Sequence, residues 1–150
     1  MATQSYSQSY APATPTAPLA GRGPDLALLA LRVVGGLMFA QHGAQKLLGW
    51  FVAPERAGAA LPAVGSMPWV AGVLELTGGV LLAVGLFTRP VAFLLAGLMA
   101  VAYFTAHASQ GFWPIVNRGE LAVLYCFVFL LLWATGAGAF SLDALRRRRR

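Results

Sequence analysis

Four stretches of the chain consist largely of apolar side chains and are separated by segments rich in glycine, proline and polar residues. They cover about residues 26–50, 68–87, 91–106 and 119–135. At a rise of about 1.5 Å per residue, helices of this length approach or reach the roughly 30 Å thickness of the bilayer hydrocarbon. The pattern predicts an all-α integral membrane protein, built as a four-helix transmembrane bundle.

The flanking segments have a different composition. Residues 1–24 are rich in Ser, Gln, Tyr, Ala, Thr and Pro and show no periodicity. They have neither the basic start nor the apolar core of a signal peptide. We therefore expect a disordered cytoplasmic tail over residues 1–24, a four-helix transmembrane domain over 25–143 and a basic cytoplasmic tail over 144–150.

Overall composition agrees with a membrane protein. Hydrophobic residues make up 58% of the chain and charged residues 11%, whereas a soluble domain is about 25% charged. The net charge of +6 does not indicate a nucleic-acid partner, because five of the eleven basic residues are Arg146–Arg150. The single cysteine, Cys126, cannot form an internal disulfide, and we expect it to be a core residue. No Cys/His spacing typical of a metal site is present.

Ionisable residues occur inside two of the apolar stretches, and these residues suggest a function. An ionised side chain costs roughly 2.5–3.5 kcal/mol on membrane-insertion scales, so it needs a reason to be there. The first stretch contains Arg32, His42 and Lys46, and the second contains Glu75. For Arg32 we expect the role of a buried structural charge. Lys46 has a simpler alternative explanation, since a lysine near a helix end can extend its amine to the membrane surface.

Glu75 is placed on a face suited to close helix packing. Gly72, Glu75 and Gly79 follow the i, i+3, i+7 spacing of one helix face, and small residues let helix backbones approach in a membrane. We predict that Glu75 pairs with a basic group, Lys46 being the first choice and Arg118 the second. Such a pair serves either a binding site or only the packing of the helices.

Four spans place both termini on the same side of the membrane. That side carries Arg22, Arg89 and Arg146–Arg150, and the other side carries Lys46, Arg56 and Arg118. The positive-inside rule then predicts cytoplasmic termini, and this orientation depends on the terminal arginine run.

With this topology, most polar residues of the helices gather at the outer end of the bundle. This end holds the candidate ligand-binding residues, which are His42, Gln45, Lys46, Glu75, His107, Asn117, Arg118 and Glu120. Glu120 has a second explanation, because a carboxylate in the first turn of a helix is stabilised by the helix dipole.

An ordered set of motifs resembles the DoxX family of small bacterial membrane proteins. The matching segments are 32–36 (RVVGG), 42–47 (HGAQKL), 75–79 (ELTGG), 85–89 (GLFTR), 117–120 (NRGE) and 136–143 (GAGAFSLD). The resemblance implies a four-helix protein of the bacterial plasma (inner) membrane. The family name derives from similarity to a subunit of a thiosulfate:quinone oxidoreductase, and some members are linked to membrane redox complexes with soluble partners.

Two functions from different classes follow. In the first, the chain is a redox-linked membrane subunit whose outer pocket binds a quinone headgroup or a small sulfur-containing anion. Lys46 and Arg118 then supply positive charge, His42 or His107 moves protons, and Glu75 holds a base in place. No haem, flavin or metal motif is evident, so quinone is the one cofactor considered, and electrons require a redox partner protein.

In the second, the chain is a non-enzymatic membrane scaffold or assembly factor whose buried charges only fix the helix packing. A pathway for protons or small solutes is disfavoured, because the polar residues cluster at one end. The sequence does not determine the oligomeric state.

Overall fold

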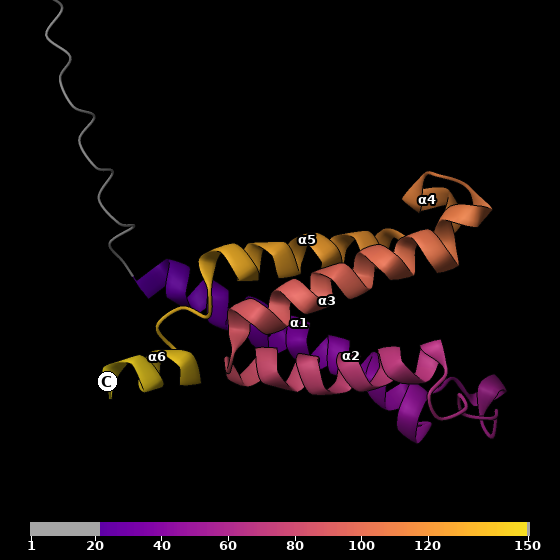
Figure 1. The fold of residues 1–150 in the computed structure, drawn as a ribbon, viewed down its shortest axis with the longest axis horizontal. Helices are drawn as coiled ribbons and strands as arrows, with labels where there is room; N and C mark the ends of the chain where they lie inside the picture. Colours follow the sequence, from indigo (N-terminus) through magenta and orange to yellow (C-terminus); the bar gives the residue numbers. More distant parts are fainter. Residues whose placement is uncertain (1–21, 150) are drawn as a thin grey trace, which may run out of the picture.

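The computed structural model describes residues 22–149 and, within them, shows helices and no strands (Figure 1). The long helices are α1 (Arg22–Leu48), α2 (Met67–Val84), α3 (Thr88–Ala102) and α5 (Glu120–Thr135). Shorter elements are the 3₁₀ turn η1 (Pro54–Arg56), the π-helical turn η2 (Tyr103–His107), the 3₁₀ turn η3 (Ala108–Gln110), α4 (Pro114–Asn117) and α6 (Leu142–Arg148).

The four long helices form two antiparallel pairs. Helix α1 packs along α2, and α3 packs along α5. Figure 1 shows the pairs meeting at the end where α6 lies and diverging toward the end where α4 lies. We call these the α6 end and the α4 end of the bundle.

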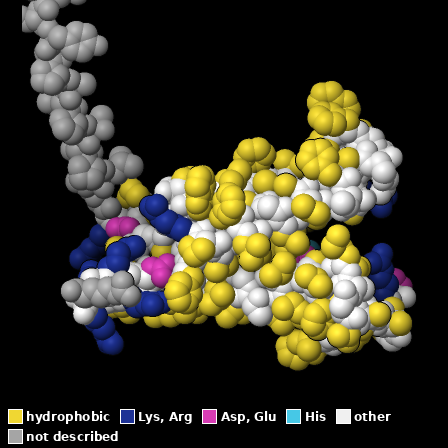
Figure 2. Space-filling view, viewed as in Figure 1, with side chains coloured by type: hydrophobic (Ala, Val, Ile, Leu, Met, Phe, Trp, Pro, Cys, Tyr) yellow, Lys and Arg dark blue, Asp and Glu magenta, His cyan; other side chains and the backbone are white. Residues whose placement is uncertain are grey.

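The outer surface of the bundle is apolar along its length. Val34, Phe93 and Phe127 are each more than half exposed, and Figure 2 shows hydrophobic side chains covering the flank, with arginines and lysines gathered at the ends. Helices α1, α2 and α3 with its continuation to Gln110 are long and apolar enough to cross a membrane, and α5 is a shorter apolar helix. The predicted all-α membrane bundle is confirmed.

The turn between α2 and α3 lies earlier than the sequence pattern predicted. Helix α2 ends at Val84 rather than Phe87, and residues 88–90, expected as the turn, form the first turn of α3. Gly85 ends α2 in the left-handed region with φ of 70°, where glycine lacks the Cβ clash of other residues. Pro90 fits the start of α3 because the first helical N–H groups have no partner within the helix.

Both flanking segments also differ from their predicted bounds. Helix α1 begins at Arg22, within the predicted 1–24 tail, whereas residues 1–21 lie outside the described part of the chain. Residues 144–148 of the predicted basic tail belong to α6, which is capped by the Ser141 hydroxyl accepting from the Ala144 N–H at 3.1 Å. The predicted loops contain η1, η3 and α4.

Glycines let α1 and α2 come into backbone contact. A Cβ at Gly36 would lie 2.6 Å from the Gly79 carbonyl oxygen, and one at Gly43 would lie 2.6 Å from the Gly72 carbonyl oxygen. These distances are shorter than van der Waals contact, so larger residues would push the helices apart. Gly35, by contrast, faces away from any neighbour.

At the α6 end, Arg32 of α1 caps the C-terminus of α2. Its side chain is 1% exposed, and it donates hydrogen bonds to the Leu82 and Ala83 carbonyls at 3.2 and 3.1 Å and to the Phe140 carbonyl at 2.6 Å. The last carbonyls of a helix have no partner within it and carry partial negative charge, so the guanidinium satisfies and neutralises them.

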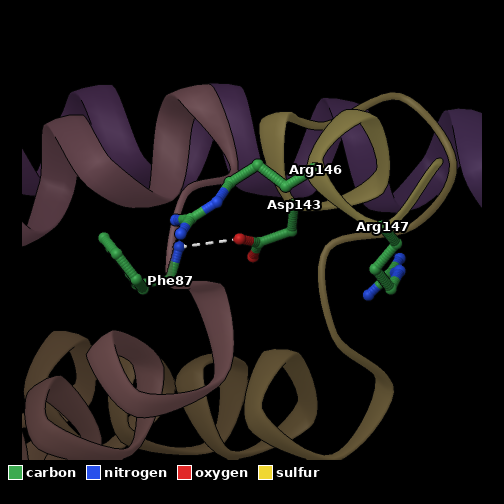
Figure 3. Close-up of a pocket in the computed structure, with 4 residues that line it drawn as sticks. All are labelled: Phe87, Asp143, Arg146 and Arg147. Atoms are coloured by element: carbon green, nitrogen blue, oxygen red, sulfur yellow. Dashed lines mark hydrogen bonds between the residues drawn. The ribbon is translucent and has the colours of Figure 1, made fainter. Parts of the chain in front are cut away.

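Asp143 caps the start of α3 from the other side of the same turn (Figure 3). Its carboxylate accepts hydrogen bonds from the backbone N–H groups of Phe87 and Thr88, both at 2.9 Å. Phe87 has φ of 51°, a left-handed conformation that costs a residue with a Cβ roughly 1–2 kcal/mol. The hydrogen bonds to Asp143 offset this cost and hold the turn.

The environment of Asp143 favours its ionised form. Burial raises the pKa of Asp143, but hydrogen bonds from Thr88 and Phe87 and the charge of Arg147 outweigh burial and bring the pKa below its ordinary value of 3.8. A carboxyl group whose pKa is lower in the folded protein stabilises the fold above its unfolded pKa, and this contribution disappears as the pH falls through the folded pKa.

We therefore predict that Asp143→Asn lowers the free energy of unfolding at pH 7 by about 1 kcal/mol, since an amide loses the charge and one acceptor. The difference from the wild-type protein should shrink as the pH falls from 7 through the lowered pKa of Asp143, because the wild-type carboxyl group then takes up a proton and loses its charge as well. Thermal unfolding in an uncharged detergent, measured along this pH series, tests the prediction. Glu55→Gln, at an exposed residue of η1, is the control. Equal stabilities at pH 7, or an unchanged difference at low pH, would contradict the capping role.

Candidate functional site

A cavity of about 410 Å³ opens between the two helix pairs at the α4 end. Figure 2 shows the molecule hollowed between its two lobes at this end. The volume falls within the roughly 300–1,000 Å³ typical of small-molecule sites. Its lining comes from all four long helices and their connections. The polar or aromatic residues of the lining are Phe39, His42, Lys46, Glu75, Thr105, His107, Arg118 and Tyr125. Five of the eight predicted site residues therefore meet at one cavity.

Lys46 and Glu75 form the predicted ion pair across the α1–α2 contact. The Lys46 amine lies 2.5 Å from each of the two carboxylate oxygens of Glu75. The Glu75 side chain is 5% exposed and that of Lys46 is 32% exposed. The carboxylate is therefore fixed inside the bundle, while the lysine reaches from the pair toward the cavity opening.

His107 lies beyond α3, in the π-helical turn η2 that continues this helix. The π turn η2 ends at this residue, and π turns often occur at functional sites because they re-aim side chains. The His107 Nδ1 atom lies 3.0 Å from the Asn117 carbonyl oxygen. A carbonyl only accepts, so Nδ1 carries the hydrogen, and Nε2 is the nitrogen left to exchange a proton with a ligand.

His42 and Arg118 complete the charged and titratable part of the lining. His42 is exposed, and its ring meets that of Tyr125 edge-on with 6.3 Å between centroids. Arg118 ends α4 with φ of 60° and is also exposed. Both side chains are free to move toward a ligand, unlike Glu75.

The other three predicted site residues lie away from the cavity lining. Asn117 is 1% exposed, and its side chain donates to the Gly111 carbonyl and the Tyr103 hydroxyl and accepts from the Gly119 N–H. All its polar atoms thus serve the connection from α3 to α5. Gln45 donates to the Phe51 carbonyl at 3.1 Å, and Glu120 is an exposed residue in the first turn of α5.

Tyr125 is a site residue that the sequence analysis missed. It lines the cavity and is 8% exposed. Its ring stacks on that of Phe129, with 5.5 Å between the ring centroids, and its centroid lies 5.1 Å from that of Phe39. These three aromatic rings pack together next to His42. The signal was present, because Tyr125 has the only hydroxyl group within the apolar run 121–134.

Among the residues that the structure describes, no three His, Cys, Asp or Glu side chains are grouped to hold a metal ion. Within the same described residues, the lining itself offers a free cation, an ion pair, two imidazoles and a phenol. Together these groups can donate hydrogen bonds to an oxygen-bearing ligand and exchange protons with it.

Comparison with known families identifies the chain. The sequence profile of the DoxX family matches residues 27–108, which is more than half of the chain. The chain belongs to the DoxX family. The matched region covers most of α1 and all of α2, and extends through α3 to the start of η3, so it includes Lys46, Glu75 and His107 of the cavity.

Several curated proteins are similar to this family member over most of their length. An uncharacterised protein of Haemophilus influenzae is 47% identical over 77% of this chain and 87% of its own. A Bacillus subtilis protein named "Putative oxidoreductase CatD" is 32% identical, covering 79% of this chain and 86% of its own. The inner membrane protein YqjF of Escherichia coli is 28% identical, covering 83% and 95%. No solved structure matches the chain significantly.

The geometry of the ion pair predicts unequal effects of removing either partner. Lys46→Met leaves the buried Glu75 carboxylate without a counter-charge and should lower the free energy of unfolding by about 3 kcal/mol. Glu75→Leu should cost less, because Lys46 is already partly exposed and can extend its amine to the surface. The double variant Lys46→Met/Glu75→Leu should be more stable than Lys46→Met alone.

Thermal unfolding of the detergent-purified variants measures these differences. Glu120→Leu is the matched control, since Glu120 is an exposed glutamate with no ion pair in the described chain. If the double variant is as unstable as Lys46→Met, the unpaired Glu75 carboxylate is not the cause of the instability, and Lys46 is not its main partner.

Proposed function

We propose that the cavity binds a quinone headgroup and that the chain is a membrane subunit of a redox system. One observation supports this proposal most strongly. The cavity combines a mostly apolar lining with Lys46, Glu75 and His107 at a single end of the bundle. A quinone has the same two-part character, with a polar headgroup and a long apolar tail.

The position of the cavity allows a ligand to reach it from the bilayer. Val70, Val101 and Leu121 line the cavity and are 42%, 50% and 55% exposed. Each lies on a helix flank that would face lipid. A lipid-soluble molecule would thus insert its headgroup while its tail remained among the acyl chains, without crossing water.

The lining residues have separate roles in this proposal. Lys46 and Arg118 donate hydrogen bonds to a carbonyl oxygen of the headgroup. His107 exchanges a proton through Nε2 while Asn117 holds its ring, and Glu75 keeps Lys46 oriented. A bound quinone supplies the redox chemistry, because it takes up two electrons and two protons to become a quinol. We assign electron delivery to a redox partner protein, and the name of the Bacillus relative agrees with a redox role.

We further infer that the chain lies in the bacterial inner membrane with four spans and cytoplasmic termini. The inner-membrane name of the Escherichia relative supports the location. Helix α5 has 16 residues, or about 24 Å at 1.5 Å per residue, and would cross with slight local thinning of the bilayer. The positive-inside rule places the arginine-rich α6 end in the cytoplasm.

A scaffold function is the second candidate, and one observation favours it. The Lys46–Glu75 pair joins α1 to α2 directly, and such a pair can serve helix packing alone. A small sulfur-containing anion is the alternative ligand for the same cavity, because Lys46 and Arg118 would also attract it.

The quinone proposal predicts that filling the cavity weakens binding. Leu121→Trp should weaken binding of a short-chain ubiquinone at least about tenfold, which corresponds to about 1.4 kcal/mol. Phe127→Trp is the matched control, since Phe127 lies on the same helix, is 65% exposed and does not line the cavity. Binding is measured by ligand-dependent thermal shift and by quinone that co-purifies in mild detergent.

Quinone binding equal in both tryptophan variants would contradict the cavity as the site. A shift with thiosulfate or sulfite but not with ubiquinone would favour the anion alternative. If neither ligand binds and partner proteins co-purify equally with both variants, the scaffold function is supported.

The orientation predicts where reporters are active. A reporter that works only outside the cytoplasm should be inactive when fused after Arg150 and active when inserted after Gly58, at the opposite end of the bundle. A reporter that is active after Arg150 and inactive after Gly58 would instead place the cavity in the inner leaflet. A reporter specific for the cytoplasm, fused at the same two sites, is the control for expression.

A further inference from the structure

Two small cavities adjoin at the α6 end and share Arg146. One of about 300 Å³ is lined by Phe87, Asp143, Arg146 and Arg147 (Figure 3). The other, of about 230 Å³, is lined by Leu86, Leu142, Leu145, Arg146 and Arg149. The first is polar and basic, whereas the second has three leucines beneath an arginine rim. This region is separate from the cavity at the α4 end.

The arginines of this region keep most of their hydrogen-bonding capacity. The guanidinium of Arg146 lies over the Phe87 ring, 4.7 Å from its centroid, which fixes its position by a cation–π contact. The nearby Asp143 carboxylate accepts from the Phe87 and Thr88 N–H groups. Within residues 22–149, none of the α6 arginines lies within ion-pair distance of a carboxylate. The guanidinium donors therefore remain available to an external anion.

The apolar residues of α6 place the same surface at the membrane boundary. Leu142 and Leu145 are 41% and 53% exposed and line one cavity with Leu86 of the α2–α3 turn. Figure 2 shows the basic side chains at this end next to the hydrophobic flank of the bundle. A short helix with arginines above leucines is suited to the level at which phosphate headgroups meet acyl chains.

We propose that the α6 region is a binding site for an anionic glycerophospholipid. Arg146, Arg147 and Arg149 hold the phosphate and its headgroup, and the three leucines contact the first part of an acyl chain. Charge complementarity and the continuity of the leucines with the lipid-facing flank favour a phospholipid over a soluble protein.

Binding at this site stabilises the α6 end of the bundle. A lipid held by Arg146 keeps α6 against Phe87, and α6 carries Asp143, which caps α3. Anionic lipid therefore adds to the stability of the α2–α3 turn through contacts that exist only in the folded protein.

The test uses the full chain in an uncharged maltoside detergent, titrated with phosphatidylglycerol or with phosphatidylcholine of the same acyl chains. Thermal unfolding reports binding. Phosphatidylglycerol should raise the melting temperature, and phosphatidylcholine should not. Arg146→Gln/Arg149→Gln should weaken phosphatidylglycerol binding by about fivefold for each arginine removed. Arg22→Gln/Arg56→Gln, with the same loss of charge at residues that line neither cavity, should bind as the wild-type protein does.

Two further arms separate the sources of the effect. Inorganic phosphate at the same concentrations should give no shift, since it has no acyl chain to contact the leucines. Leu145→Ser keeps every charge and should weaken phosphatidylglycerol binding about tenfold, so the proposal stays testable even if the arginine variant is poorly folded.

Several results would overturn the proposal. These are equal shifts with both lipids, an equal shift with inorganic phosphate, equal losses in the two arginine double variants, or wild-type affinity in Leu145→Ser.

Discussion

Charged side chains inside an apolar bundle must find partners within the protein, and this constraint determines how the two ends of the structure are built. Arg32 is satisfied at one end by the free carbonyls at the C-terminus of α2. Glu75 is satisfied near the other end by Lys46. Both interactions join α1 to α2, and both depend on the glycines that bring these helices into contact. A bulkier residue at Gly36 or Gly43 would weaken the two charge interactions together.

The paired charges have different roles at the two ends of the bundle. At the α6 end, Arg32 and Asp143 cap the facing ends of α2 and α3, and their hydrogen bonds close one tight turn. At the α4 end, the helix pairs diverge, and the Lys46–Glu75 pair lines a cavity together with His42, His107 and Arg118. Asn117 holds the connection from α3 to α5 by hydrogen bonds, which keeps His107 in position without filling the space. A rigid end and an open end suit a protein that binds a ligand from the membrane.

Much of this arrangement could be predicted from the sequence, because ionisable residues in apolar helices are rare and few pairings are possible. The i, i+3, i+7 spacing around Glu75 identified the packed face. Lys46 was predicted as its partner because it ends the first helix at a similar depth from the same side. The role of Asn117 could not be predicted, because an amide near a helix start serves a loop or a ligand equally well until the loop path is known. Tyr125 was missed because an aromatic residue in an apolar run resembles core packing. The capping role of Asp143 depends on a contact 55 residues away in the chain, and no local pattern indicates it.

The central claim is that the cavity between the helix pairs receives a quinone headgroup from the bilayer. Photolabelling tests this most directly, with a photoreactive quinone added to the protein in lipid nanodiscs and the labelled peptides identified by mass spectrometry. The account predicts labelling of residues 39–46 and 98–107 and of the start of α5 at 121–125, with labelling lost when excess unlabelled quinone competes. Labelling confined to lipid-facing residues such as Phe93 and Phe127, and unchanged by the competitor, would contradict it.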